Sequence, residues 1–159
     1  MAEARFESPI RADHSAAKLL ITDESAGPKG RIVGTAHADV EMGTSARRGG
    51  ALVFSTSPGE WTVLGESGEI DLTHVRVVVR VTGGDAPALL AKVCALDFGD
   101  DMFPSGRAAR TDLAGIAAEI VRDDIDESAS YLLVVSRSFG GYLEDVLVDQ
   151  AREFGIGAS

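Results

Sequence analysis

A glycine-rich corner is the first place in this sequence where chemistry could occur. Gly83-Gly84-Asp85 joins a valine-rich segment to a segment of helical periodicity, and phosphate-binding loops occupy such corners. A dinucleotide-binding loop needs a third glycine further on, and a Walker loop needs a lysine after its second glycine; neither follows here. Asp85 would also place negative charge where a phosphate must bind. The pattern therefore favours a plain turn in which Asp85 caps the next helix.

Two acidic segments are candidate metal-binding loops. Residues 97–101 read Asp-Phe-Gly-Asp-Asp, and residues 123–127 read Asp-Asp-Ile-Asp-Glu. A calcium loop of the EF-hand kind alternates oxygen ligands, has glycine at its sixth position and closes with a glutamate. Neither segment has this spacing. Both are therefore interpreted as solvated loops, and no metal site is predicted.

Serine, histidine and cysteine show no local catalytic signature. Neither Ser105 nor Ser138 lies in a Gly-x-Ser-x-Gly elbow. The three histidines are far apart in the sequence, so only the tertiary structure could assemble a triad. Cys94, the single cysteine, excludes an internal disulfide and lies near an apolar helical stripe, where a buried thiol is the default. We therefore predict no catalytic or cofactor-binding residue in this chain.

Two arginines are candidates for contact with another protein. Arg76 and Arg80 project from one side of the valine-rich segment, with Val78 between them. Two interpretations stay open: a solvated outer face, or a face that a partner covers, because arginine suits interface ion pairs and stacking. Trp61, the only tryptophan, is interpreted as a core residue whose indole N–H needs an acceptor.

The valine-rich segment and the helix after it are the best-defined elements. Residues 75–82 alternate valine with other residues, which predicts a strand whose valine side is buried. Pro87 lies in the first turn of the predicted helix 86–96, where its missing N–H costs nothing. The apolar face of that helix is formed by Leu89, Leu90, Val93 and Leu96. We expect this face to pack on the strand.

Hairpins dominate the rest of the chain. Strands are expected at 18–23, 31–34, 51–55, 61–64, 107–113, 116–122 and 131–135, with a surface loop at 35–50. Ser138 is expected to cap a closing helix that ends at Gly155, with an inward face of Tyr142, Leu143, Val146, Leu147 and Phe154. Residues 1–17 are interpreted as an N-terminal arm and 18–159 as a single domain. The fold class is α+β, with a mostly antiparallel sheet and two main helices.

The composition restricts the classes of partner. The 159 residues are 45% hydrophobic and carry a net charge of −10, which is typical of a globular protein and unfavourable for binding nucleic acid or an anionic membrane. No window of 18 apolar residues occurs, and the first residues lack the apolar core of a signal peptide. We expect a cytoplasmic protein that binds neither nucleic acid nor membrane.

Several segments, in order, resemble the gamma subunit of heterotetrameric sarcosine oxidase. They are Pro-Gly-Glu-Trp at 58–61, Asp-Leu-Thr-His at 71–74, Gly-Gly-Asp-Ala-Pro-Ala-Leu-Leu-Ala-Lys-Val-Cys at 83–94, Phe-Pro-Ser-Gly at 103–106, Arg-Thr-Asp-Leu-Ala-Gly-Ile at 110–116, Ser-Arg-Ser-Phe at 136–139 and Ala-Arg-Glu-Phe-Gly at 151–155. The chain is similar, more distantly, to the folate-binding aminomethyltransferase family of the glycine cleavage system. The resemblance covers residues 58–155.

The resemblance implies the fold of the folate-binding aminomethyltransferase-like superfamily and a part in sarcosine catabolism. That family of complexes demethylates sarcosine oxidatively to glycine, with hydrogen peroxide and methylenetetrahydrofolate as products. FAD, FMN and NAD belong to its alpha and beta subunits, zinc belongs to delta, and tetrahydrofolate binds outside gamma. The implied role for this chain is a structural subunit, itself not catalytic, that docks on alpha in a complex with beta and delta.

The candidate partner interface consists of arm residues and strand residues. Phe6, Pro9 and Ile10 are expected to anchor the arm on a larger partner, and Arg76 and Arg80 to pair with its carboxylates.

Two alternatives to the structural-subunit interpretation stay open. One is a stand-alone folate-dependent aminomethyltransferase or folate-binding repair protein. The transferase's Gly-Gly-x-x-Asp-Asp region is not found, since Asp100-Asp101 follow a single glycine, and the repair family's Lys-Gly-Cys-Tyr-x-Gly-Gln motif keeps only Lys92 and Cys94. The other alternative is the equivalent subunit of an oxidase for a different N-methyl amine.

Overall fold

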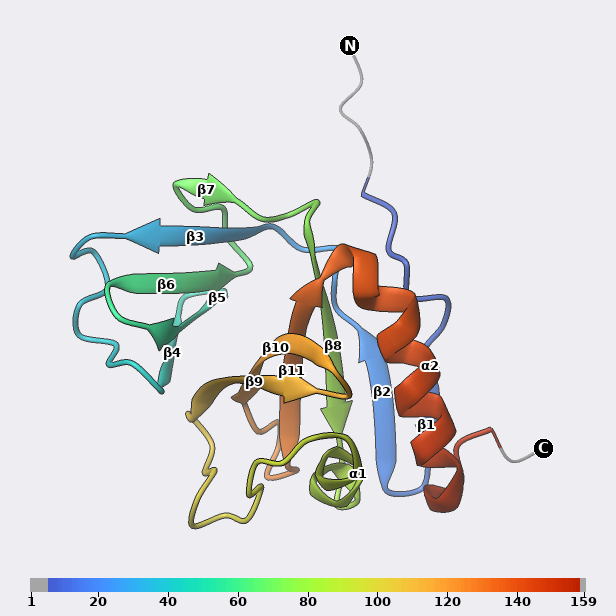
Figure 1. The fold of residues 1–159 in the computed structure, drawn as a ribbon. Coiled ribbons are helices and arrows are strands. Elements are labelled where there is room, and N and C mark those ends of the chain that lie inside the picture. The colour runs from blue at the N-terminus through green and yellow to red at the C-terminus, as the bar shows by residue number, and fades with distance from the viewer. Residues whose placement is uncertain (1–5, 158–159) are drawn as a thin grey trace.

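The computed structural model describes residues 6–157, which form two antiparallel sheets and two α-helices (Figure 1). The elements are β1 (His14–Ala16), β2 (Leu19–Asp23), β3 (Lys29–Val33), β4 (Ser45–Arg48), β5 (Ala51–Ser57), β6 (Glu60–Leu64), β7 (Ile70–Asp71), β8 (Arg76–Thr82), α1 (Ala86–Val93), β9 (Ala108–Leu113), β10 (Ile116–Arg122), β11 (Ser130–Ser136), η1 (Arg137–Phe139), α2 (Gly140–Ala151) and η2 (Arg152–Phe154). The predicted α+β class is confirmed.

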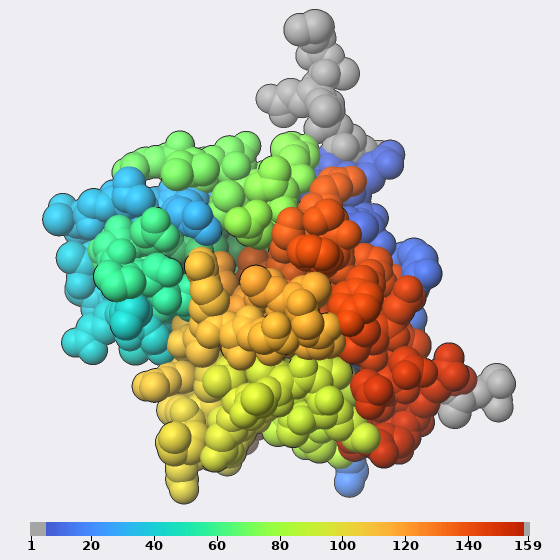
Figure 2. Space-filling model, in the orientation of Figure 1, coloured from blue at the N-terminus to red at the C-terminus, as the bar shows by residue number. Residues whose placement is uncertain are grey.

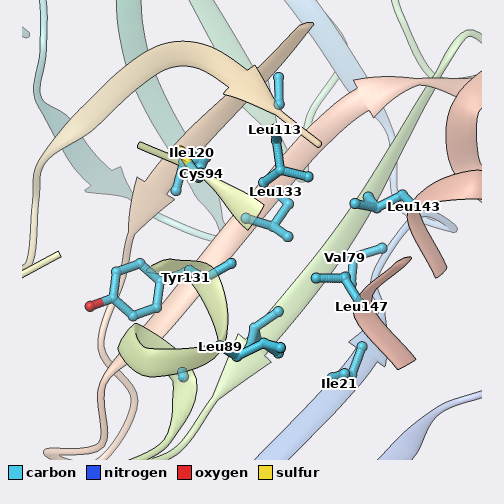
Figure 3. Packing of buried hydrophobic residues seen from close by; sticks show 14 of the residues in the cluster. Ile21, Val79, Leu89, Cys94, Leu113, Ile120, Tyr131, Leu133, Leu143 and Leu147 are labelled. Carbon is cyan, nitrogen blue, oxygen red and sulfur yellow. The ribbon is translucent and has the colours of Figure 1, made fainter. Parts of the chain in front are cut away.

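The larger sheet has the order β1-β2-β8-β11-β10-β9, and β8 lies near its middle. One side of β8 faces the helices: Val77, Val79 and Val81 are buried in the main core. Figure 3 shows Leu143 and Leu147 of α2 beside Val79. The buried valine side and the packing of α1 and α2 on it follow the predicted pattern. No helix within residues 6–157 combines the length and apolarity needed to cross a bilayer.

The other side of β8 is covered by the chain's own second sheet. This sheet has the order β4-β5-β6-β3-β7. Val78 of β8 packs with Leu52 and Phe54 of β5 in a separate apolar cluster. The side of β8 that carries Val78 and Arg80 is therefore an inner surface and not an outer one. Period-two alternation indicates two sides but not which of them the rest of the chain covers.

The second sheet has a small core of its own around the tryptophan. Trp61 packs with Val40, Val53 and Val63, and its indole Nε1–H donates to the carbonyl oxygen of Val40 at 2.9 Å. Both expectations for this residue, a core position and a partner for its N–H, are confirmed. Cys94 is likewise buried, as predicted.

The glycine corner between β8 and α1 is shaped by backbone packing. Gly83 has φ +125°, and a Cβ built on it would lie 2.2 Å from the carbonyl oxygen of Lys18, so only glycine fits. Asp85 makes no side-chain capping bond; its backbone N–H donates to the same Lys18 oxygen at 3.1 Å. Asp85 thus occupies the predicted N-cap position of α1 but does not cap it through its side chain. Pro87 does lie in the first turn of α1.

Several local predictions differ from the structure. β4 lies inside the predicted 35–50 loop, because Ser-Ala-Arg-Arg has no strand pattern of its own and is ordered by pairing with β5. The closing helix begins with the 3₁₀ turn η1, and Ser138 makes no capping bond. Tyr142 is 47% exposed instead of inward-facing, and Val75 is 46% exposed because it precedes β8.

Candidate functional site

Arg80 is buried, and its partners belong to this chain. Its side chain is 5% exposed. Nε donates to Glu24 at 2.7 Å, Nη1 donates to the Ser130 hydroxyl at 2.8 Å, and Nη2 donates to the Asp123 carboxylate at 3.0 Å. The carboxylates that were expected to come from a partner protein thus come from Glu24 and Asp123 of this chain. Its placement does not match a partner-facing residue, because the second sheet covers this side of β8.

Arg122 holds the acidic loops in a similar way. Its guanidinium pairs with Asp124 at 2.9 Å and Asp100 at 2.6 Å, and it lies over the ring of Tyr131. The hydrogen bond to Asp124 is the main cause that raises the pKa of Arg122. The two acidic loops are therefore anchored on buried arginines and are not simply solvated. Within residues 6–157 no group of three or more candidate ligand side chains could hold a metal ion.

The arm residues contact their own domain. The ring of Phe6 lies between two cations, with Lys29 Nζ 4.9 Å and the Arg137 guanidinium carbon 5.0 Å from its centre. Pro9 packs so closely on Gly140 that a Cβ there would lie 2.5 Å from its ring. Residues 1–5 of the predicted arm lie outside the described residues.

Ile10 and Glu144 join the next part of the arm to α2. Ile10 is 8% exposed and belongs to the main core. The buried Glu144 carboxylate accepts the backbone N–H groups of Arg11 and Ala12 at 2.9 and 3.2 Å, and His14 Nε2 lies 2.9 Å from it. Burial alone raises the pKa of Glu144, but the hydrogen bonds from His14 and Arg11 outweigh it and lower the pKa to about 2. Part of the predicted arm is thus integral to the domain.

Arg76 lies elsewhere, in a pocket lined by strands of the larger sheet and by η1. A cavity of about 200 Å³ is lined by Arg76, Arg110, Glu119 and Phe139 among others. A smaller pocket is lined by Arg31 together with the same Arg110 and Glu119. The two pockets share Arg110 of β9 and Glu119, and together they form what is called the cleft below; Arg76 of β8 lines the larger pocket and Arg31 of β3 the smaller one. Figure 2 shows the face on which the β9–β10 hairpin lies between the second sheet and the start of α2.

The charges in this cleft do not balance. Glu119 is buried, faces Arg110 in the β9–β10 register and accepts the Thr56 hydroxyl at 2.5 Å. Within residues 6–157, none of the three arginines has a carboxylate within 4.0 Å of its nitrogens. Burial, Arg31 and Arg110 lower the pKa of Arg76, and Glu119 opposes them. The arrangement suits the binding of an anion through charge-assisted hydrogen bonds.

Sequence reasoning found only one member of this group. Arg76 was predicted as a contact residue, whereas Arg31 and Arg110 were missed. The three positions lie on separate strands that are far apart in the sequence, and Arg31 comes near Arg110 only because the second sheet packs on the first. The burial pattern of β9 alternates: its two ends are buried, and half-buried and exposed residues alternate from 109 to 112. This alternation of β9 is the one local feature that marks Arg110 as lying on an exposed side.

Comparison with known proteins reveals likeness in fold. No family model matches the sequence, and no curated protein matches it. The structure resembles a chain of the heterotetrameric sarcosine oxidase from Corynebacterium sp. U-96 in complex with pyrrole 2-carboxylate, with a TM-score of 0.77 and 20% identity, over 89% of this chain and 88% of that one. It also resembles the glycine cleavage system aminomethyltransferase T from Bartonella henselae, with a TM-score of 0.55 and 13% identity, over 79% of this chain and 47% of that one. The fold is aminomethyltransferase-like, as the sequence resemblance implied.

Proposed function

We propose that this chain is a structural, non-catalytic subunit of an oxidase complex of the heterotetrameric sarcosine oxidase kind. The observation that carries the proposal is the extent of the match: nearly all of this chain corresponds to nearly all of one chain of that oxidase. The match to the aminomethyltransferase, in contrast, covers less than half of the longer protein. The counterpart of this chain in that oxidase is therefore a separate chain and not one part of a longer one.

In this proposal the chemistry belongs to the complex. The complex converts sarcosine to glycine and hydrogen peroxide, and tetrahydrofolate captures the one-carbon unit as methylenetetrahydrofolate. Subunits equivalent to alpha, beta and delta supply FAD, FMN, NAD and zinc and bind the folate. This chain docks on alpha, and its contribution is assembly.

Two alternatives have observations in their favour. The similarity to aminomethyltransferase T favours a stand-alone folate-dependent transferase or folate-binding protein. The same fold in an oxidase that acts on another N-methyl amine is equally compatible with the match to the sarcosine oxidase chain.

Co-expression tests the proposal. The tagged chain is produced together with the large flavoprotein subunits and the small zinc subunit of such a complex, and it should recover them in fixed proportion with sarcosine oxidase activity. The chain purified alone should show no flavin absorbance and no turnover with sarcosine and tetrahydrofolate. Turnover by the isolated chain would support the transferase alternative instead. Activity of the complex on a different N-methyl amine would identify the other oxidase.

A further inference from the structure

The cleft carries more positive charge than the chain itself neutralises. Its two pockets are lined by three arginines, Arg31, Arg76 and Arg110, and by only two carboxylates. These are the buried Glu119, whose Oε2 accepts the Thr56 hydroxyl, and the half-buried Glu60 of the smaller pocket. Arg76 donates to the carbonyl oxygen of Val75 at 3.3 Å. Other arginines of this protein, such as Arg80 and Arg122, have two carboxylate partners each. The cleft therefore lacks an anionic partner that the rest of the fold provides elsewhere.

The size of the cleft indicates what kind of anion it accepts. Pockets for drug-sized ligands and cofactors have volumes of roughly 300–1,000 Å³. The larger cavity here has about 200 Å³ and the adjoining pocket about 10 Å³. This space suits a side chain better than a cofactor. Arg31 and Arg76 are half-buried and Arg110 is exposed, so each is accessible from solvent, and Arg110 lines both pockets.

Exposed apolar side chains lie in the cleft and on the segments next to its lining residues; they are called its rim below. Phe139 lines the cavity and is 43% exposed, and Val75, next to Arg76, is also exposed. Tyr142, one turn further along α2, donates to the carbonyl oxygen of Ala114 in the β9–β10 turn and leaves its ring in solvent. Aromatic residues and arginine are the types enriched in protein–protein interfaces and their hot spots.

We propose that this cleft and its rim form a docking site for a protein partner that inserts a glutamate or aspartate side chain between Arg31, Arg76 and Arg110, while Phe139 and Tyr142 pack around it. The inference rests on the proposed function in so far as that function supplies the partner, the large flavoprotein subunit. The sequence analysis predicted Arg76 and Arg80 as contact residues; in this docking site Arg76 stays, and Arg31 and Arg110 take the place of the buried Arg80. The chain has a net charge of −10, yet this cleft has a local excess of positive charge. A partner that presents an acidic side chain at the matching position is therefore complementary to it.

Two double variants of equal charge change test the inference in the co-expressed complex. Arg76→Ala/Arg110→Ala removes two cations from the cleft, and Arg107→Ala/Arg152→Ala removes two exposed arginines outside it as the matched control. Truncating one side of a buried, hydrogen-bonded charge pair weakens binding roughly 30-fold or more. The cleft variant should therefore lose the flavoprotein subunits on washing, whereas the control should retain them as the wild type does. Phe139→Ala should weaken retention without a charge change.

The controls separate the outcomes. Thermal melting of the isolated chain should be the same for both double variants; if the cleft variant unfolds, Arg110→Ala alone, at an exposed position, replaces it. Failure of the wild type to recover the flavoprotein subunits would overturn the proposed function. Recovery by the wild type and by the cleft variant alike would overturn the docking site alone. A stabilisation of the isolated wild type by citrate or phosphate that the cleft variant loses would identify a small-anion site and overturn the protein partner.

Discussion

At the scale of single residues, the buried and half-buried charged side chains of this protein divide into those that pair with an opposite charge within residues 6–157 and those that do not. Arg80, Arg122 and Glu144 each have partners within the chain. Arg31 and Arg76 have none among the carboxylates of residues 6–157. The first group serves stability, and the second group supports the proposal of a docking site.

The Arg80 network gives a stability prediction. Arg80→Ala leaves Glu24 and Asp123 without their buried cation, and breaking such a pair costs about 2–4 kcal/mol when the partner carboxylates keep some exposure to water. Urea denaturation of the isolated chain measures the change in the free energy of unfolding. Arg107→Ala, at an exposed position, should change it by less than about 0.5 kcal/mol. Equal values for the two variants would contradict the network.

Glu144 gives a pH dependence. Its pKa falls from the ordinary 4.5 to about 2 in the folded chain, so the stability it contributes is complete above pH 4.5 and is lost as the pH falls towards 2. Glu144→Gln removes this contribution. The difference in free energy of unfolding between wild type and variant should be largest near neutral pH and should shrink between pH 4.5 and 2. A constant difference across that range, measured by urea denaturation, would contradict the lowered pKa of Glu144.

At the scale of elements, the sequence predicts what is local and misses what is imposed from a distance. The β8–α1 unit was predictable because valine alternation, a first-turn proline and helical leucine spacing agree within 22 residues, from 75 to 96. β4 and β7 were not, because strands of four and two residues have no pattern of their own and are ordered by the strand beside them. The arginine cleft was missed for the same reason, since its residues come from three strands and two sheets.

The glycine corner tests this distinction with two adjacent residues. Gly83→Ala adds a Cβ 2.2 Å from the Lys18 oxygen at a φ of +125°, which should destabilise the fold by about 2–4 kcal/mol. Gly84→Ala adds a Cβ that meets nothing within 4 Å and should have little effect. Thermal melting of both variants measures the contrast. Similar losses at both positions would mean that the corner is not set by contact with Lys18.

At the scale of the whole molecule, the described part of the N-terminal segment, residues 6–17, belongs to the folded domain. Sequence reasoning assigned residues 1–17 to an arm because the segment shows little periodicity. Yet Ile10 lies in the main core and β1 extends the larger sheet. An isolated apolar residue followed by a three-residue strand leaves no pattern that a window of sequence can detect.

Deletion of residues 2–12 should therefore weaken the fold itself. The deletion removes Ile10 from the core and the two backbone N–H groups that Glu144 accepts, and the expected loss is about 2–5 kcal/mol, the range for removal of one large buried side chain. Urea denaturation of the shortened chain measures it. A free energy of unfolding equal to that of the full chain would show that the segment is an independent arm after all.

The Glu144 contacts also protect one edge of the larger sheet. β1 covers the outer side of β2 over only three residue pairs, and Leu20 on β2 is already 42% exposed. When acid or a substitution at position 144 releases this segment, the backbone N–H and carbonyl groups of β2 become available for pairing with another chain. The segment freed from one molecule fits the vacated edge of a second, which is the geometry of strand exchange. Acidic, concentrated solutions of the isolated chain should therefore accumulate swapped dimers.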